Sequence, residues 1–267
     1  VNGDYSEVSI TIDNTTPTLS SVSISPTTIY NDTVVTCSAS ATDSDDGTLV
    51  PSFEWQIGTV TYSGSTLDLS TTSALPSDTV SCTATAVDTL GASVSDSISF
   101  VVGNRAPVVS GVAISPNSGV LTDSVLQCSA TVVDGDGETI IPSFEWSIGT
   151  SIIANGDTLV LDNSLVQPAD IITCAVTGTD SYGATHSSSA QVTVDNSAPV
   201  LSALGITPSS PLISDTITCA ASVSDLDGGI PTMTFAFANQ TTGVSYAPTT
   251  QSTSSATLDL SGTAVLP

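Results

Sequence analysis

Pairs of aspartates recur along the chain and supply oxygen atoms of the kind that bind a hard metal ion. The pattern Asp-x-Asp occurs at Asp43 and Asp45, at Asp134 and Asp136, and at Asp225 and Asp227. Ca²⁺ takes about six to eight oxygen ligands, and clustered carboxylates with backbone carbonyls provide them. Aspartate and glycine are also good turn formers without any metal. The pattern therefore leaves two interpretations, a calcium site and a plain turn.

Five cysteines also lie at regular positions. Cys37, Cys128 and Cys219 are each 91 residues apart, and Cys82 and Cys174 are 92 apart. Regularly placed cysteines indicate disulfides, which form in an oxidising, extracellular setting. The alternative is a set of buried free thiols in a cytosolic protein.

Composition excludes several functional classes. One cation, Arg105, stands against 26 acids, for a formal net charge of −25. No basic patch can form, so we expect neither nucleic acid nor anionic membrane as a partner. No apolar stretch of about 18 residues is present, so we expect no membrane insertion in this segment. His186 is the only histidine, and no nucleophile–base pair or metal cluster of catalytic type is evident, so we expect no enzyme.

Apolar alternation predicts an all-β fold. Val35, Cys37 and Ala39 alternate on one segment, and Phe53 and Trp55 on the next. With 39% apolar residues in this pattern, folded sheet is favoured over disorder despite the Ser- and Thr-rich composition.

Three units start at related Asn-x-x-Pro segments. Asn14, Asn104 and Asn196 begin them, 90 and 92 residues apart. This period predicts domains at 17–106, 107–198 and 199–267, preceded by residues 1–16, whose alternating Val8, Ile10 and Ile12 match the last strand of a further domain. The third domain carries about nine extra residues between 239 and 255.

The third domain is expected to be incomplete. Pro267 corresponds to Pro76 and Pro168, each of which stands six residues before the second cysteine of its unit. Either the sequence is a window of a longer repeat chain, or the N-terminal strand of one copy completes the open domain of the next.

A cysteine, a tryptophan 18 residues later and a second cysteine 45 or 46 residues after the first resemble an immunoglobulin-type sandwich. The segment Val-Asp-Asn-Ser-Ala-Pro and the Asp-x-Asp-Gly turn are similar to bacterial and archaeal Ig-like, PKD and cadherin-like repeats of surface proteins. The resemblance covers the whole chain and implies tandem Ig-like Greek-key β-sandwich domains in a linear array. The chain departs from the immunoglobulin pattern at Val80 and Ile172, two residues before the second cysteine, where a tyrosine is usual. It also departs at Phe235, which replaces the tryptophan in the third unit.

The resemblance also implies pairings and a clustering of acids. It pairs Cys37 with Cys82 and Cys128 with Cys174, and leaves Cys219 unpaired or bonded to another chain. Two loops of each domain would meet the incoming linker at one end, where Ca²⁺ would stiffen the joint. The groups expected at the three joints are Asp13, Asp43, Asp45 and Asp88; Asn104, Asp134, Asp136 and Asp180; and Asp195, Asp225 and Asp227.

The function expected is structural: a repeat segment of an extracellular fibre, filament or adhesin stalk at the cell surface, which self-associates or continues a longer repeat chain. One alternative is an adhesion module that binds a glycan or a cell-surface protein through the third unit's insert and Tyr246; another is an accessory stalk of a secreted enzyme. Asn14, Asn31 and Asn239 match the N-glycosylation pattern, at a frequency near chance for a chain this rich in threonine.

Overall fold

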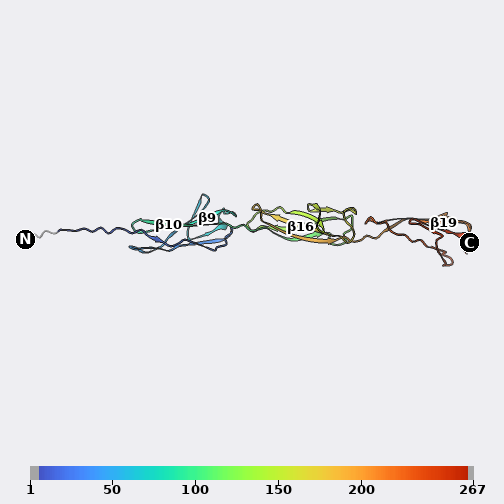
Figure 1. Cartoon of the computed structure of the whole chain (residues 1–267), viewed down its shortest axis with the longest axis horizontal. Helices are drawn as coiled ribbons and strands as arrows, with labels where there is room; N and C mark the ends of the chain where they lie inside the picture. Colours follow the sequence, from blue (N-terminus) through green and yellow to red (C-terminus); the bar gives the residue numbers. More distant parts are fainter. Residues whose placement is uncertain (1–5, 264–267) are drawn as a thin grey trace, which may run out of the picture. The chain divides into compact units, whose positions relative to one another are not determined.

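A computed structural model of the chain describes residues 6–263, which form strands, turns and two short 3₁₀ helices (Figure 1). Residues 1–5 and 264–267, including Pro267, lie outside the described residues. Backbone contacts divide the chain into two compact units. One holds the first repeat together with Val132–Ile141 and Gly178–His186; the other holds Val109–Thr131, Pro142–Thr177 and the described residues from Ser187 onward. The loops of the second repeat that carry Asp134 and Asp180 therefore group with the first repeat.

The first repeat is built from antiparallel strands in three sheets. The largest has the order β10-β9-β6-β7, from Ser93–Val101, Thr79–Val87, Ser52–Ile57 and Val60–Ser63. A second has the order β2-β3-β8, from Ser23–Ser25, Val34–Ser38 and Thr66–Asp68. A small third sheet orders β1-β4-β5, from Thr18–Leu19, Ala41–Asp43 and Gly47–Leu49. Strand β8 leads into the 3₁₀ helix Leu69–Thr71, whose first turn is capped by the Asp68 carboxylate.

The core of this repeat contains inward side chains from two of these sheets. Val35 and Cys37 of β3 cluster with Trp55 of β6 and with Val80 and Cys82 of β9. Trp55 is fully buried, and its indole N–H donates to Gly64 O over 2.9 Å, so its one polar atom is satisfied. The apolar residues that alternate along these strands in the sequence thus face this core.

The second repeat follows the same plan. Its larger sheet has the order β14-β13-β16-β17, from Ser151–Asn155, Ser143–Ile148, Ile171–Thr179 and Thr185–Thr193. Its smaller sheet has the order β11-β12-β15, from Val108–Ser115, Val125–Val133 and Thr158–Val160. The registers agree, since Trp146 lies opposite Cys174 as Trp55 lies opposite Cys82.

The third repeat has a smaller core and a hairpin of its own. One sheet has the order β18-β19-β23-β22, from Val200–Thr207, Thr216–Ser224, Ser255–Asp259 and Thr250–Gln251. A hairpin pairs β20, Phe237–Ala238, with β21, Ser245–Tyr246, and the extra residues begin in its turn. The 3₁₀ helix Leu260–Gly262 follows β23. Tyr246 packs against the core cluster that contains Phe237 and Leu258. The ring is half-buried and also lines an apolar cavity with Phe237 and Leu258.

The strand expected around Val8, Ile10 and Ile12 is not formed. These side chains are 85–88% exposed, and residues 6–16 carry no strand assignment. A strand needs a neighbour for its N–H and C=O groups, and no described segment pairs with this one. Among the described residues, no helix is long and apolar enough to cross a membrane.

Candidate metal centre

One hydrogen bond recurs where each linker meets the Asp-x-Asp turn that follows it. The residue after the linker asparagine donates its backbone N–H to the second aspartate of the turn. The three pairs are Thr15 to Asp45 at 2.8 Å, Arg105 to Asp136 at 2.6 Å, and Ser197 to Asp227 at 2.8 Å. The second aspartate therefore fixes the linker to the turn in every repeat.

The first aspartate of each turn holds the turn itself. Its Oδ1 accepts the N–H of the second aspartate, at 2.7 Å for Asp43, 2.7 Å for Asp134 and 2.9 Å for Asp225. This local bond is the usual reason for aspartate in such a turn. It occupies one carboxylate oxygen and leaves the other to make a different contact.

The linker asparagine contacts the third acid of the group. Asn104 Nδ2 donates to Asp180 Oδ2 over 2.8 Å, and Asn14 Nδ2 donates to Asp88 Oδ2 over the same distance. Asp180 Oδ1 also accepts the backbone N–H groups of Tyr182 and Ala184. The bond from Asn104 lowers the pKa of Asp180, and the bond from Asn14 lowers that of Asp88, in each case against the opposing effect of burial.

At the second repeat these contacts assemble a group of acids. Oxygen atoms of Asp134, Glu138 and Asp180 all lie within 4.8 Å of one another. Asp134 and Asp180 are buried, and the side chain of Asp136 is fully inaccessible to solvent. Carboxylates held this close repel one another unless a cation lies among them.

Four residues here use one polar atom in a hydrogen bond and leave a second one buried without a hydrogen bond. Asp134 Oδ1, Asp136 Oδ2 and Glu138 Oε1 accept hydrogen bonds, and Asn104 donates through Nδ2. The atoms left without a hydrogen bond are Asn104 Oδ1, Asp134 Oδ2, Asp136 Oδ1 and Glu138 Oε2. Buried polar atoms in folded proteins are nearly always paired, with protein, water or an ion. Asp136 Oδ1 has the guanidinium of Arg105 at 3.6 Å, whereas the unpaired oxygens of Asn104, Asp134 and Glu138 are candidate ligands of a bound cation or water. An all-oxygen donor set fits Ca²⁺ or Mg²⁺ better than a softer metal.

The only basic side chain of the chain lies beside this group. Arg105 Nη1 is 3.6 Å from Asp136 Oδ1, and the guanidinium also forms an ion pair with Asp32. The hydrogen bond with Asp32 raises the pKa of Arg105 above its ordinary value. Arg105 offsets part of the negative charge, but it approaches Asp136 rather than the three clustered acids.

The first repeat has a less complete version of the group. Asp43 Oδ2 is buried and unpartnered, as in Asp134. Asp46, however, accepts hydrogen bonds from the Thr89 N–H and hydroxyl, and Asp45 is exposed and bonded to Thr15. The Thr15 N–H and hydroxyl lower the pKa of Asp45.

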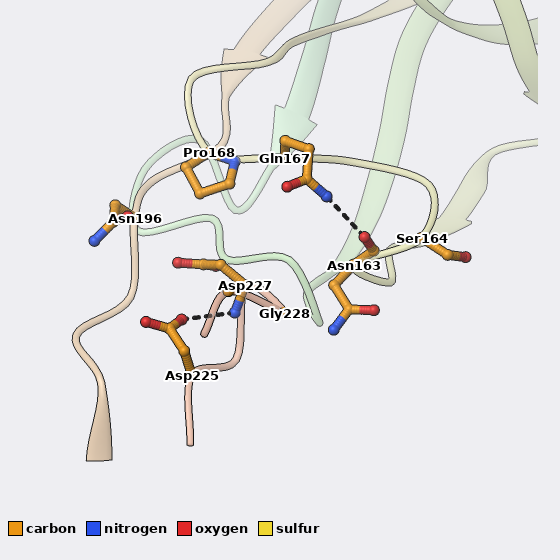
Figure 2. Close-up of a pocket in the computed structure, with 9 residues that line it drawn as sticks. Asn163, Ser164, Gln167, Pro168, Asn196, Asp225, Asp227 and Gly228 are labelled. Carbon is orange, nitrogen blue, oxygen red and sulfur yellow. Dashed lines mark hydrogen bonds between the residues drawn. The ribbon is translucent and has the colours of Figure 1, made fainter. Parts of the chain in front are cut away.

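In the third repeat, Asp225 and Asp227 line an open cavity of about 540 Å³ with Asn196 and Asn163. Figure 2 shows the Asp225 carboxylate accepting the Asp227 N–H at this cavity. Burial opposes ionisation of Asp227, but hydrogen bonds from Ser197 and Thr122 together lower its pKa. Both carboxylate oxygens of Asp227 thus accept hydrogen bonds. Within the described residues, no third acidic side chain forms a cluster with Asp225 and Asp227.

The structure therefore distributes the expected ligands unevenly. It brings Asn104, Asp134, Asp136 and Asp180 to one place and adds Glu138, which the sequence analysis missed. Asp13 and Asp195 are exposed and belong to no described acid cluster. Glu138 follows the second glycine of Asp-Gly-Asp-Gly-Glu, where the first and third repeats have Gly47 and Gly229. This departure from the repeat is the feature of the sequence from which Glu138 could have been predicted as a site residue.

The structure contains two disulfides at the spacing read from the sequence. Cys37 bonds to Cys82 and Cys128 to Cys174, while Cys219 is a half-buried free thiol.

The three candidate glycosylation residues differ in their contacts. Asn14 and Asn31 use the side-chain nitrogen to which a glycan would attach, donating to Asp88 and to Asp136 O. Asn239 uses its carbonyl oxygen, which accepts from Thr241 and Thr242.

Comparison with solved structures gives distant similarities to surface proteins. A structure from work on host cell surface retention of a 1.5-MDa bacterial ice-binding adhesin is 14% identical, covers 93% of this chain and 89% of its own, and has a TM-score of 0.36. A Ca²⁺-stabilized adhesin of an Antarctic bacterium is 16% identical, with 82% and 60% coverage and a TM-score of 0.26. Three N-terminal domains of the bacteriophage RB49 Highly Immunogenic Outer Capsid protein are 13% identical, with 90% and 85% coverage and a TM-score of 0.27.

No protein-family model matches the chain, and comparison with curated protein sequences gives no match. All three TM-scores are below 0.5, so these similarities say nothing about the ligand or the function of this chain.

Proposed function

We propose that the chain is a structural segment of an extracellular fibre or adhesin stalk, in which Ca²⁺ holds successive domains at a fixed angle. The domains are the three repeats, 17–106, 107–198 and 199–267, and their folds are Ig-like Greek-key sandwiches. The observation that carries the proposal is the group of Asp134, Glu138 and Asp180, whose oxygens lie within 4.8 Å of one another, together with the unpaired buried oxygens of Asn104, Asp134 and Glu138.

The positions of these residues support a role at a joint. Asn104 belongs to the linker, Asp134, Asp136 and Glu138 to one loop of the second repeat, and Asp180 to another. Asn31 of the first repeat donates to Asp136 O over 2.8 Å. A cation bound by these oxygens would tie the linker to both loops, so the linker could not swing without losing ligands. Ca²⁺ would supply charge neutralisation, and the side chains would supply the geometry.

Several features support an extracellular location. Two disulfides suit an oxidising compartment, and free Ca²⁺ is abundant enough outside cells to fill weak sites. In this role the chain self-associates or continues a longer repeat polypeptide, as a fibre requires. The alternative of glycan or protein binding through the insert keeps Tyr246 as its aromatic residue, since this ring is half-buried and lines an apolar cavity of the third repeat.

Small-angle scattering of the full chain in EDTA and in Ca²⁺ tests the role. We expect Ca²⁺ to narrow the distribution of end-to-end distances, and Glu138→Gln to abolish the change. Identical scattering in the two conditions would leave the acids as turn formers.

A further inference from the structure

Arg105 makes a group of contacts that involve no metal. Its side chain donates to Gly135 O and to Asp32, and its guanidinium carbon lies 4.3 Å above the centre of the Tyr30 ring. Tyr30 and Asp32 belong to the turn before β3 in the first repeat, and Gly135 to the acidic loop of the second. Arg105 itself lies in the linker. One side chain thus contacts the linker's neighbours on both sides.

Two glycines, Gly135 and Gly103, leave space for the side chains of Arg105 and Tyr30. A Cβ at Gly135 would lie 2.7 Å from Arg105 Cδ, which is too close for any other residue without a shift. A Cβ at Gly103 would lie 3.1 Å from Ile29 O and 3.2 Å from the Tyr30 ring. Glycine at these two places therefore allows the arginine and the tyrosine to occupy their positions.

The same positions in the next joint are filled differently. Counting from the cysteines and the linker prolines, the counterparts of Tyr30, Gly103, Arg105 and Gly135 are Leu121, Asp195, Ser197 and Leu226. Four departures from the repeat therefore fall on residues that contact one another. A surface arginine without a role would not need four matched changes.

We propose that Arg105 is a built-in cation that clamps the first repeat to the second through Tyr30 and Asp32, and does so without bound metal. The joint before the third repeat, with Ser197 at this position, has no such clamp and depends on its hydrogen bonds and any bound ion. The clamp goes beyond the proposed calcium role, since the contacts of Arg105 with Tyr30, Asp32 and Gly135 use none of the proposed metal ligands. An ion pair and a cation–π contact at a partly exposed site are each modest, but both act on one guanidinium.

Trypsin provides a direct readout, because Arg105–Ala106 is its only cleavage site in the chain. Cleavage requires the guanidinium to leave the clamp, so the rate reports the population of the opened joint. The experiment measures cleavage of the full chain in EDTA, against a synthetic peptide of residues 100–110 that contains the same bond. Two variants keep the bond and remove one partner each: Asp32→Asn, and Tyr30→Leu, which introduces the residue found at the counterpart position 121.

We expect the intact chain to be cut at least about tenfold more slowly than the peptide, and each variant to be cut about two- to fivefold faster than the intact chain. Asp123→Asn is the matched control, since Asp123 holds in the second repeat the turn position that Asp32 holds in the first. This variant should be cleaved by trypsin at the rate of the intact chain. Far-ultraviolet circular dichroism and melting of each variant exclude general unfolding.

Equal rates for the intact chain and the two variants would overturn the clamp, as would cleavage of the intact chain at the rate of the peptide. A second arm in Ca²⁺ separates this proposal from the calcium role. Protection by Ca²⁺ tests the metal, whereas the difference between variants in EDTA tests Arg105, so either can fail alone.

Discussion

Asn104 donates its side-chain N–H to Asp180 Oδ2 over 2.8 Å. Because an amide has one nitrogen and one oxygen on opposite sides, this bond decides that Oδ1 faces away from Asp180. That oxygen is buried and unpartnered, as is Asp134 Oδ2. The linker asparagine thus bonds Asp180 through its nitrogen and keeps a buried oxygen that no hydrogen bond uses.

Asp134→Asn should raise the melting temperature in EDTA. The side-chain amide of Asn keeps an oxygen that can accept the Asp136 N–H. The substitution removes one negative charge from the group that Asp134 forms with Glu138 and Asp180. We expect an increase on the order of a few degrees by differential scanning calorimetry. Asp225→Asn is the control, since it holds the same turn position in the third repeat and has no such cluster around it. A lower melting temperature for Asp134→Asn, beyond that of the control, would contradict mutual repulsion at this site.

Tyr182 offers a spectroscopic probe of the same charges. Burial raises the pKa of its phenol, and so does the negative charge of Glu138 and neighbouring aspartates. A bound cation would offset that charge, so Ca²⁺ should lower the pKa of Tyr182. Ultraviolet titration of phenolate in carbonate-free buffer, with Tyr182→Phe to identify its share of the signal, measures the shift. An unchanged titration curve in Ca²⁺ would count against a cation near Glu138.

Acid should destabilise the fold through the pinned aspartates. Hydrogen bonds lower the pKa of Asp180, Asp88 and Asp45 below the ordinary value of 3.8. A lowered folded-state pKa gives stability that is fully present above the unfolded value and is lost as pH falls through the folded value. In EDTA, we therefore expect the stability from these groups to fall as pH drops below about 4. Asn104→Ala should make melting less sensitive to pH in that range, and an unchanged acid limb would refute the role assigned to this bond.

Loss of a disulfide should cost more than loss of any single hydrogen bond. The bond between Cys37 and Cys82 spans 45 residues of sequence, and closing a loop of that length stabilises by up to ~4 kcal/mol on the chain-entropy model. Cys37→Ala with Cys82→Ala should lower the midpoint of urea unfolding of the first repeat, with Cys219→Ala as the control for removing a thiol. A double variant as stable as the control would show that the tryptophan-centred core suffices.

Much of the fold was predictable because its signals are local. Alternation identified the inward faces of β3 and β6, where Val35, Cys37 and Trp55 are buried. Alternation also predicted a strand at Val8–Ile12, which has no strand assignment. A strand forms only with a neighbour, and alternation says nothing about whether one is present.

The candidate site was only partly predictable for a similar reason. Asp134, Asp136 and Asp180 follow from the turn pattern and the resemblance, whereas Glu138 has no counterpart in the other repeats. The environment of Arg105 depends on residues more than 70 positions away, such as Asp32. Asp13 was grouped by its place in the sequence alone, and its side chain is exposed and in no described acid cluster.

Calorimetric titration of the EDTA-treated chain with Ca²⁺ tests the central claim most directly. Glu138→Gln removes one ligand charge from the cluster, and Asp96→Asn removes the same charge from an exposed position on β10. We predict saturable binding to the intact chain, at least about tenfold weaker binding at one site in Glu138→Gln, and no change in Asp96→Asn. Absence of binding at millimolar Ca²⁺, or equal binding by all three proteins, would contradict a metal centre at the second repeat.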